Sequence, residues 1–245
     1  MRILVFRYLL FFLSLVGVSP SLAVPSGLPI APFEARYTVY AWGLPVGKSI
    51  LTLTEIDASR YRMNAEVHAI GIAILLMPEP INIQSEGQWR DGTLTPLQYQ
   101  YKKGIDRNTA DTHLKFDWQR GIIQAHNNDQ QVTLLLSERV VDPLSLQLLA
   151  MWDLHRGYQP GQYTTVIDAE LETYQVKLEG EEIVPTALGN LPALRFSSHK
   201  PKGNRVTTLW FTPSLDYLLI QAVQTRKGKE KFRIVIDQVA EIVNR

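Results

Sequence analysis

The stretch FEARYTVY, residues 33–40, decides the fold class of this 245-residue chain, because its side chains alternate in character. Every second position is apolar or aromatic, and the positions between carry Glu, Arg, Thr and Tyr. A period of two places successive side chains on opposite faces of a β-strand, so residues 33–40 are predicted as a strand with one wet face. The same alternation recurs at 49–54 and 61–68.

Short strands continue along almost the whole chain. They are predicted at 81–90, 94–103, 112–118, 121–126, 131–136, 162–168, 173–183, 193–199, 206–211, 217–225 and 231–239. Several joints end in glycine, as in Asp91-Gly92 and Lys227-Gly228, where tight hairpins need a positive φ. Long crossover segments are missing, so an antiparallel sheet with sequential neighbours paired is expected.

One segment, 142–155, breaks the strand pattern. Asp142 and Pro143 form an N-cap followed by proline at the first helical position, and Gly157 follows the far end. The apolar stripe of this predicted amphipathic helix consists of Leu144, Leu148, Met151 and Trp152. The predicted fold class is all-β, an antiparallel meander that forms a curved sheet or partly open barrel with one amphipathic helix.

The N-terminus has the pattern of a cleavable secretory signal. Arg2 and Arg7 precede an apolar run at 8–18, and the small residues Ser21 and Ala23 end the segment. The run is shorter than the roughly 20 residues that span a bilayer. We therefore expect a signal peptide at 1–23, a single β domain at 24–245, a periplasmic location and no stable membrane span after cleavage. No cysteine is present for lipid attachment or disulfides.

The charge balance argues against nucleic acid as a partner. The chain has 25 Lys and Arg against 24 Asp and Glu, and the predicted leader removes two of the arginines. Nucleic-acid binding usually shows a concentrated basic face. The basic residues between Arg226 and Arg233 are interrupted by Gly228 and Glu230, so they are interpreted as a solvated hairpin turn.

The apolar segment AIGIAILLM, residues 69–77, has two interpretations. The favoured one is a buried core helix or strand. The alternative is an exposed lid or tip that covers a cavity or touches a partner. On the second interpretation the candidate ligand-binding residues are Ile72, Ile74 and Leu75, together with Leu148 and Trp152 of the predicted helix.

No catalytic residue, metal site or cofactor is predicted. The five histidines are scattered, and neither a G-x-S-x-G elbow nor a glycine-rich phosphate loop occurs. Glu179, Glu181 and Glu182 surround Gly180 and are interpreted as solvated glutamates at a bulge. The tryptophans are expected in the core, with sugar stacking on Trp42 as an alternative.

Several motifs, in this order and spacing, resemble an exported bacterial family catalogued as domain of unknown function 3108. They are FEARY at 33–37, WRDGTLTPLQY at 89–99, FDW at 116–118, DPLS at 142–145, LGNL at 188–191 and LWFTP at 209–213. The resemblance implies a periplasmic β protein without an established function. The closing hairpins are also distantly similar to those of periplasmic lipoprotein carriers, which are half-open barrels that hold acyl chains.

These observations support two functions from different classes. The first is a non-catalytic binding protein for an apolar or amphipathic envelope ligand, a lipid-like molecule, or a partner protein of the envelope. The alternative is an envelope hydrolase that acts on glycan or ester bonds. An enzyme is expected to gather titratable groups in a cleft, whereas a carrier is expected to have an apolar cavity with few polar groups.

Overall fold

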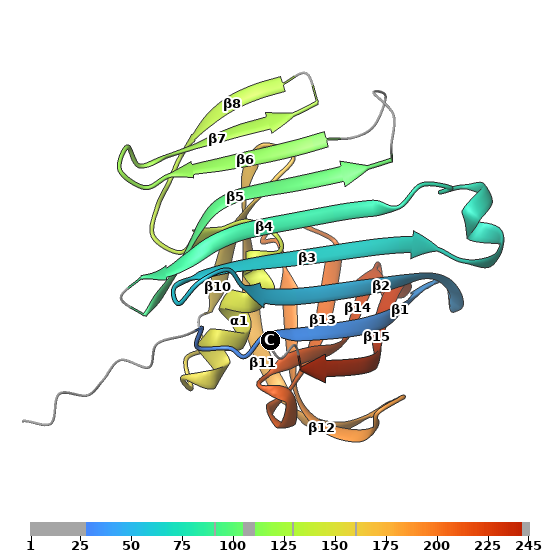
Figure 1. Ribbon diagram of the computed structural model, residues 1–245. Coiled ribbons are helices and arrows are strands. Elements are labelled where there is room, and N and C mark those ends of the chain that lie inside the picture. The colour runs from blue at the N-terminus through green and yellow to red at the C-terminus, as the bar shows by residue number, and fades with distance from the viewer. Residues whose placement is uncertain (1–27, 91, 105–110, 129, 160, 242–245) are drawn as a thin grey trace, which may run out of the picture.

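One curved sheet organises the protein, which is seen here in a computed structural model that describes residues 28–90, 92–104, 111–128, 130–159 and 161–241. Fifteen strands in these ranges form this sheet, which is mostly antiparallel and does not close on itself (Figure 1). The strands are β1 (Phe33–Ala41), β2 (Leu44–Glu55), β3 (Arg60–Ala69), β4 (Ile81–Arg90), β5 (Thr93–Lys103), β6 (Asp111–Asp117), β7 (Ile122–Asn127), β8 (Gln130–Leu135), β9 (Val140–Val141), β10 (Gln162–Ile167), β11 (Glu170–Thr186), β12 (Gly189–His199), β13 (Arg205–Thr212), β14 (Leu218–Arg226) and β15 (Lys229–Glu241). The predicted all-β fold class is confirmed. The predicted leader at 1–23 lies outside the described residues.

Sequence neighbours pair with each other almost throughout the sheet. The spatial order runs from β8 back to β1 and then from β15 back to β9, so β1 and β15 join the two halves. Ala35 lies opposite Val239 in that junction. In Figure 1 the strands of the first half lie in front of those of the second half and cross their direction. The expected meander of antiparallel hairpins is confirmed for these strands.

One edge of the sheet departs from the expectation. β9 and β10 pair in parallel, with Val140 opposite Thr164 and Val141 opposite Thr165. Parallel neighbours need a crossover connection, and the helix between these two strands supplies it. The expectation of a purely antiparallel sheet is therefore wrong at this edge, because a strand of two residues has no alternation that a sequence could reveal.

The predicted helix is present as α1 (Ser145–His155). Asp142 lies just before it and accepts hydrogen bonds from the backbone N–H groups of Leu144 at 2.9 Å and Ser145 at 2.8 Å, which is the capping role expected. The predicted amphipathic character is wrong. The buried residues of α1 are distributed around its circumference, and they are Ser145, Leu148, Leu149, Met151, Asp153 and Leu154. The reason is that apolar side chains from both halves of the sheet pack around the helix.

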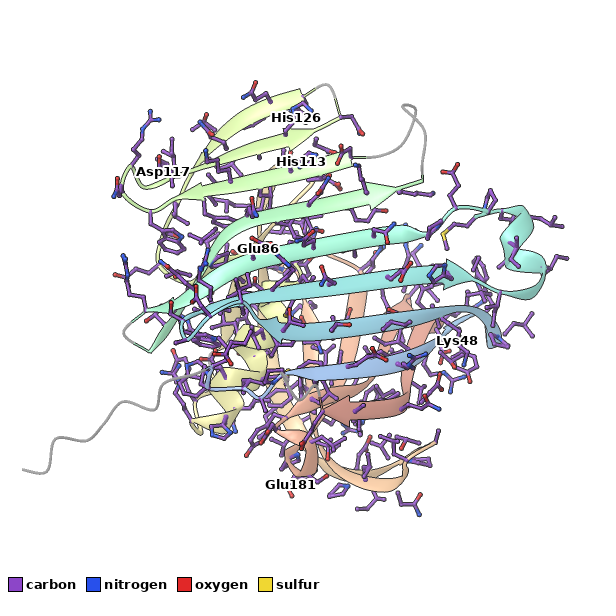
Figure 2. The ribbon with its side chains drawn as sticks, viewed as in Figure 1. Lys48, Glu86, His113, Asp117, His126 and Glu181 are labelled. Carbon is purple, nitrogen blue, oxygen red and sulfur yellow. The ribbon has the colours of Figure 1, made fainter. Side chains whose placement is uncertain are left out.

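The outward face of β1–β8 is polar. Lys48, Glu86, His113 and His126 lie on this face (Figure 2). Glu86 accepts a hydrogen bond from Arg62 at 2.6 Å, and Lys48 contacts Asp237 at 2.9 Å. The inward residues of the same strands form the main core, so the alternation in the sequence corresponds to one dry and one wet face.

The apolar segment 69–77 is exposed, so its interpretation as core is wrong. It forms the 3-10 turn η1 (Gly71–Leu75) between β3 and β4, and none of the residues in this turn is buried. η1 extends beyond the end of the sheet, away from α1, and no other element of the described residues covers it (Figure 1). The core expectation is also wrong for Trp42, which is 72% exposed. A second 3-10 turn, η2 (Pro213–Leu215), follows β13.

Gly87 is a position where the fold needs the absence of a side chain. A methyl group there would overlap the Tyr61 hydroxyl and lie 2.7 Å from the carbonyl oxygen of Thr95. Tyr61 is fully buried, so it cannot move aside freely. We expect Gly87→Ala to lower the free energy of unfolding by about 1–3 kcal/mol, measured by urea denaturation. Gly161→Ala is the matched control because its added methyl group meets nothing within 4 Å. Equal stability of the two variants would contradict the prediction.

Candidate ligand-binding cavity

An apolar cavity of about 320 Å³ lies between α1 and strands β10–β14. The helix contributes Leu146, Ala150 and Leu154 to its wall, and the strands contribute mainly aliphatic and aromatic side chains. Among the described residues that line it, none is a carboxylate, histidine, lysine or arginine. The walls are therefore suited to the apolar part of a molecule.

Regular periodicities place these side chains on the cavity wall. Leu146, Ala150 and Leu154 recur every four residues, which puts them on one side of a helix. On the sheet, Phe196 of β12 lies opposite Leu209 of β13, and side chains two residues along each strand share the same face.

Aromatic packing closes one side of the cavity. The rings of Phe196 and Phe211 meet edge to face with their centroids 5.9 Å apart. Both phenylalanines belong to a small cluster with Leu154 of the helix and Leu219 of β14. This cluster is separate from the main core and forms the apolar base of the cavity.

A few polar groups also line the cavity. Thr165 is almost fully buried, and its hydroxyl has no hydrogen-bond partner within the described part of the chain. Leaving a buried hydroxyl unpaired is costly, so a polar atom of a ligand would stabilise it. Tyr163 also lines the cavity, and its hydroxyl donates a hydrogen bond to Asp153 at 3.0 Å. Burial, followed by the charge of Asp153, raises the pKa of Tyr163.

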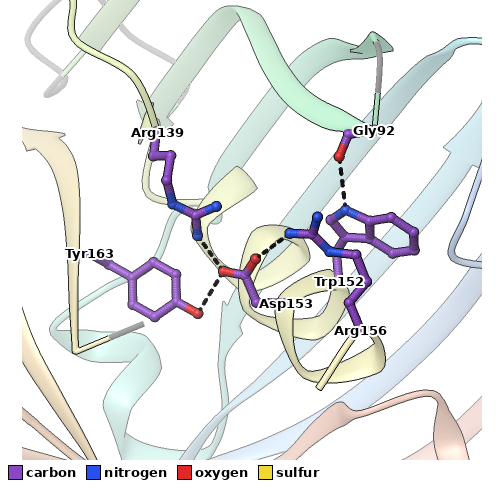
Figure 3. A network of polar contacts seen from close by, with 6 residues as sticks. All are labelled: Gly92, Arg139, Trp152, Asp153, Arg156 and Tyr163. Atoms are coloured by element: carbon purple, nitrogen blue, oxygen red, sulfur yellow. Dashed lines mark hydrogen bonds and ion pairs between the residues drawn. The ribbon is translucent and has the colours of Figure 1, made fainter. Parts of the chain in front are cut away.

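Asp153 anchors the C-terminal end of α1. Its fully buried carboxylate contacts Arg139 at 2.5 Å and Arg156 at 2.9 Å in addition to Tyr163 (Figure 3). These partners come from the segment before the helix, the end of the helix and β10. Because charge-assisted hydrogen bonds are strong when partly buried, the network holds the helical wall of the cavity against β10.

A second buried network anchors the beginning of α1. Asp142 Oδ2 accepts hydrogen bonds from Ser85 Oγ at 2.8 Å and Ser145 Oγ at 2.6 Å. Ser145 Oγ also shares a 2.7 Å hydrogen bond with the Tyr61 hydroxyl. Burial raises the pKa of Asp142 above its usual value. All four residues are fully buried, so this cluster fixes the helix to β3 and β4 and is closed to a substrate.

The five candidate site residues from the sequence do not come together. Leu148 is fully buried in the main core. Trp152 donates a hydrogen bond to Gly92 O at 3.1 Å, and its ring meets the Trp89 ring edge-on. Neither Leu148 nor Trp152 lines the cavity. The other three candidates are exposed: Ile72, Ile74 and Leu75 of η1. Ligand binding by these five residues stays a prediction.

The lining residues of α1 were missed, although the sequence carries a signal for them. Leu146, Ala150 and Leu154 have the same four-residue spacing as the stripe chosen from the sequence. A helix with apolar residues on several sides does not reveal which side meets a core and which side meets a cavity.

The glutamate cluster at Gly180 is a bulge, as expected. The register of β11 shifts between Leu178 and Gly180, where the glycine has a φ of 143°. Glu179 accepts a hydrogen bond from Ser197 at 2.7 Å, which lowers its pKa. Glu182 pairs with Arg195 and with the Trp210 indole. Across the described ranges, no three His, Asp or Glu side chains form a group that could hold a metal ion.

Fold and cavity together define a class of all-β protein with one unclosed, curved sheet and a helix-covered apolar cavity. The chain belongs to the family described as protein of unknown function (DUF3108), whose model matches residues 36–235. The resemblance noted in the sequence is thereby confirmed. No curated protein matches this chain.

Solved structures support the fold. A beta-barrel-like protein of the domain of unknown function DUF1849 from Brucella abortus is 11% identical, with a TM-score of 0.58, and the match covers 89% of this chain and 100% of that one. A candidate lipoprotein from Parabacteroides distasonis is 8% identical, covering 87% and 97%, with a TM-score of 0.35. A candidate exported protein with a YmcC-like fold from Bacteroides fragilis is 9% identical, covering 85% and 95%, with a TM-score of 0.33. The last two scores are too low to support an argument.

Proposed function

We propose that the protein is a non-catalytic binding protein that holds an apolar or amphipathic molecule of the cell envelope in the cavity beside α1. The observation that carries the proposal is the composition of the cavity wall, which is apolar apart from a few uncharged polar groups. Its volume of about 320 Å³ is at the lower end of the range of roughly 300–1,000 Å³ for small-molecule sites. A small ligand with an apolar body fits these properties.

The polar groups suggest how such a ligand is oriented. The unpaired hydroxyl of Thr165 can donate to a carbonyl or carboxylate oxygen, or accept from a hydroxyl. An amphipathic molecule with one oxygen-bearing group, such as a fatty acid, satisfies this hydroxyl while its chain lies against Leu209 and Phe211. A hydrolase would need titratable side chains at the cavity wall, and the described lining residues offer only tyrosines.

The proposed location is the periplasm, reached by means of the predicted leader at 1–23. Among the described residues, no helix combines the length and the apolar character needed to cross a membrane. A location between two membranes would give the cavity access to envelope lipids and their breakdown products.

Filling the cavity should weaken ligand binding. We expect Ala150→Phe to weaken binding of cis-parinaric acid, a fluorescent fatty acid, by about tenfold or more, because each methylene group excluded from an apolar site costs about 0.8 kcal/mol. Fluorescence titration of the protein recovered from the periplasmic fraction measures this change. Native mass spectrometry of the same sample tests for a retained ligand.

The matched control is Leu135→Phe, which enlarges an exposed side chain on β8, outside the cavity. Its affinity for the probe should equal that of the wild type, and circular dichroism should show the same fold for all three proteins. Failure of the wild type both to retain a ligand and to bind the probe would overturn the proposal, and so would unchanged binding by Ala150→Phe.

A further inference from the structure

Exposed apolar side chains gather at one end of the sheet, away from α1 (Figure 1). We call this group the apolar tip, and it consists of Trp42, Leu44, Ile72, Ile74, Leu75, Leu76 and Phe232. Ile72, Leu75 and Leu76 are 82%, 80% and 88% exposed. Such a concentration of exposed large apolar residues is unusual for a surface that meets only water.

Three separate segments form the apolar tip. The β1–β2 turn carries Trp42, whose backbone N–H donates a hydrogen bond to Lys231 O at 3.4 Å. The centroid of the Trp42 ring lies 6.3 Å from the centroid of the Phe232 ring on β15. The η1 segment is tied to the same hairpin, because Ile70 N–H donates to Val46 O at 2.9 Å. The sheet therefore brings apolar residues that are far apart in sequence to one projecting end (Figure 1).

Trp42 has an unfavourable backbone conformation for its residue type. Its φ is +51° and that of Gly43 is +83°, as in a two-residue hairpin turn with both central residues left-handed. Asparagine or glycine suits the first of these positions better than a bulky aromatic residue. Strain of this kind is typical of positions kept for a function other than folding.

Positive charges surround the apolar tip. The strand ends and turns at this end of the sheet expose Lys102, Lys103, Lys202, Arg205, Arg226, Lys227 and Lys229. Lys103 lies opposite Ile81, which is the first residue of β4 after the η1 loop. Arg226 lies opposite Lys229 in the β14–β15 hairpin. Among the acidic residues nearby, Glu230 lies 3.5 Å from Arg233, so its charge is partly balanced.

We propose that the apolar tip docks the protein onto an anionic lipid bilayer, with its tryptophan and aliphatic side chains in the interfacial region. Apolar residues that project from short loops, flanked by lysines that reach phosphate groups, are the pattern of peripheral membrane binding. Trp42 fits this assignment because tryptophan favours the headgroup level of a bilayer. The proposal does not depend on a ligand in the cavity beside α1.

Vesicle flotation tests the proposal with the protein recovered from the periplasmic fraction. We expect binding to vesicles of phosphatidylethanolamine and phosphatidylglycerol, weak binding to phosphatidylcholine, and release by high salt, because each lysine near an anionic surface contributes about a fivefold change in affinity. The double variant Leu75→Ser with Leu76→Ser should reduce binding about tenfold or more. Both residues are exposed, so the variant should keep its fold.

Two variants separate membrane docking from a structural role. Trp42→Asn should bind vesicles more weakly while its unfolding temperature stays equal or rises, because asparagine fits the turn. Leu135→Ser changes a side chain that is 78% exposed at the opposite end of the sheet, so this variant should bind vesicles like the wild type. The two proteins have the same N-terminus, so any contribution of that segment to binding is equal in both. The proposal is overturned if the wild type does not bind anionic vesicles at low salt, or if Leu135→Ser loses as much binding as the tip variant. A lack of dependence on phosphatidylglycerol would also overturn it.

Discussion

Leu148→Ala should lower the free energy of unfolding by about 2–5 kcal/mol. The Leu148 side chain is fully buried in the cluster that joins α1 to both halves of the sheet. Removing it loses the transfer free energy of three carbon atoms and leaves a cavity that the surrounding strands cannot fill. The helix is enclosed on several sides, so little relaxation is possible.

Urea denaturation followed by tryptophan fluorescence measures this effect. Leu135→Ala is the control, because that leucine is exposed at the end of β8 and its loss should change stability by less than about 1 kcal/mol. A loss below about 1 kcal/mol for Leu148→Ala would show that α1 is loosely docked. It would then be a mobile cover for the cavity beside it.

Asp142→Ala should destabilise the protein by about 3–5 kcal/mol, since it removes a helix cap and leaves several buried donors without an acceptor. The carboxylate accepts hydrogen bonds from the backbone N–H groups of Leu144 and Ser145 and from the hydroxyls of Ser85 and Ser145. Thermal denaturation measures the loss, and Asp117→Ala is the control because that residue lies at an exposed turn with Arg120. A change equal to that of the control would contradict the assigned role.

The Asp142→Asn variant isolates the effect of the charge at the same site. Burial raises the pKa of Asp142 in the folded state, so the protonated carboxyl is favoured there relative to the unfolded chain. The favourable contribution of the protonated Asp142 carboxyl to the free energy of unfolding is therefore complete below the usual pKa of about 4. This contribution is lost as the pH rises through the folded-state pKa. The stability of the wild type relative to Asp142→Asn should fall as the pH rises above about 4. Other carboxylates, such as Glu86 with its lowered pKa, are common to both proteins and cancel in this difference.

The candidate site was only partly accessible from the sequence. The helix that covers the cavity was located by its cap and by the glycine after its end, because these signals are local. The cavity itself is formed by residues from Pro143 to Leu219, which come together only after the strands pair. Which side of α1 meets the main core and which side meets the cavity depends on the strands around it. The stripe predicted from the sequence, which includes Leu148 and Trp152, is therefore not the stripe that lines the cavity. The cavity is lined by Leu146, Ala150 and Leu154.

The amino-acid sequence by itself determined the strands other than β9, their hairpin joints and the helix α1. Alternation with a period of two, glycine at tight turns and the Asp142 cap all act between residues close in the chain. The tertiary structure alone decided the parallel pair of β9 and β10, the cavity, and the exposure of residues 69–77. An apolar segment is buried only if other elements reach it, and the sheet ends before η1, so the same residues that could have formed a core form a projecting tip.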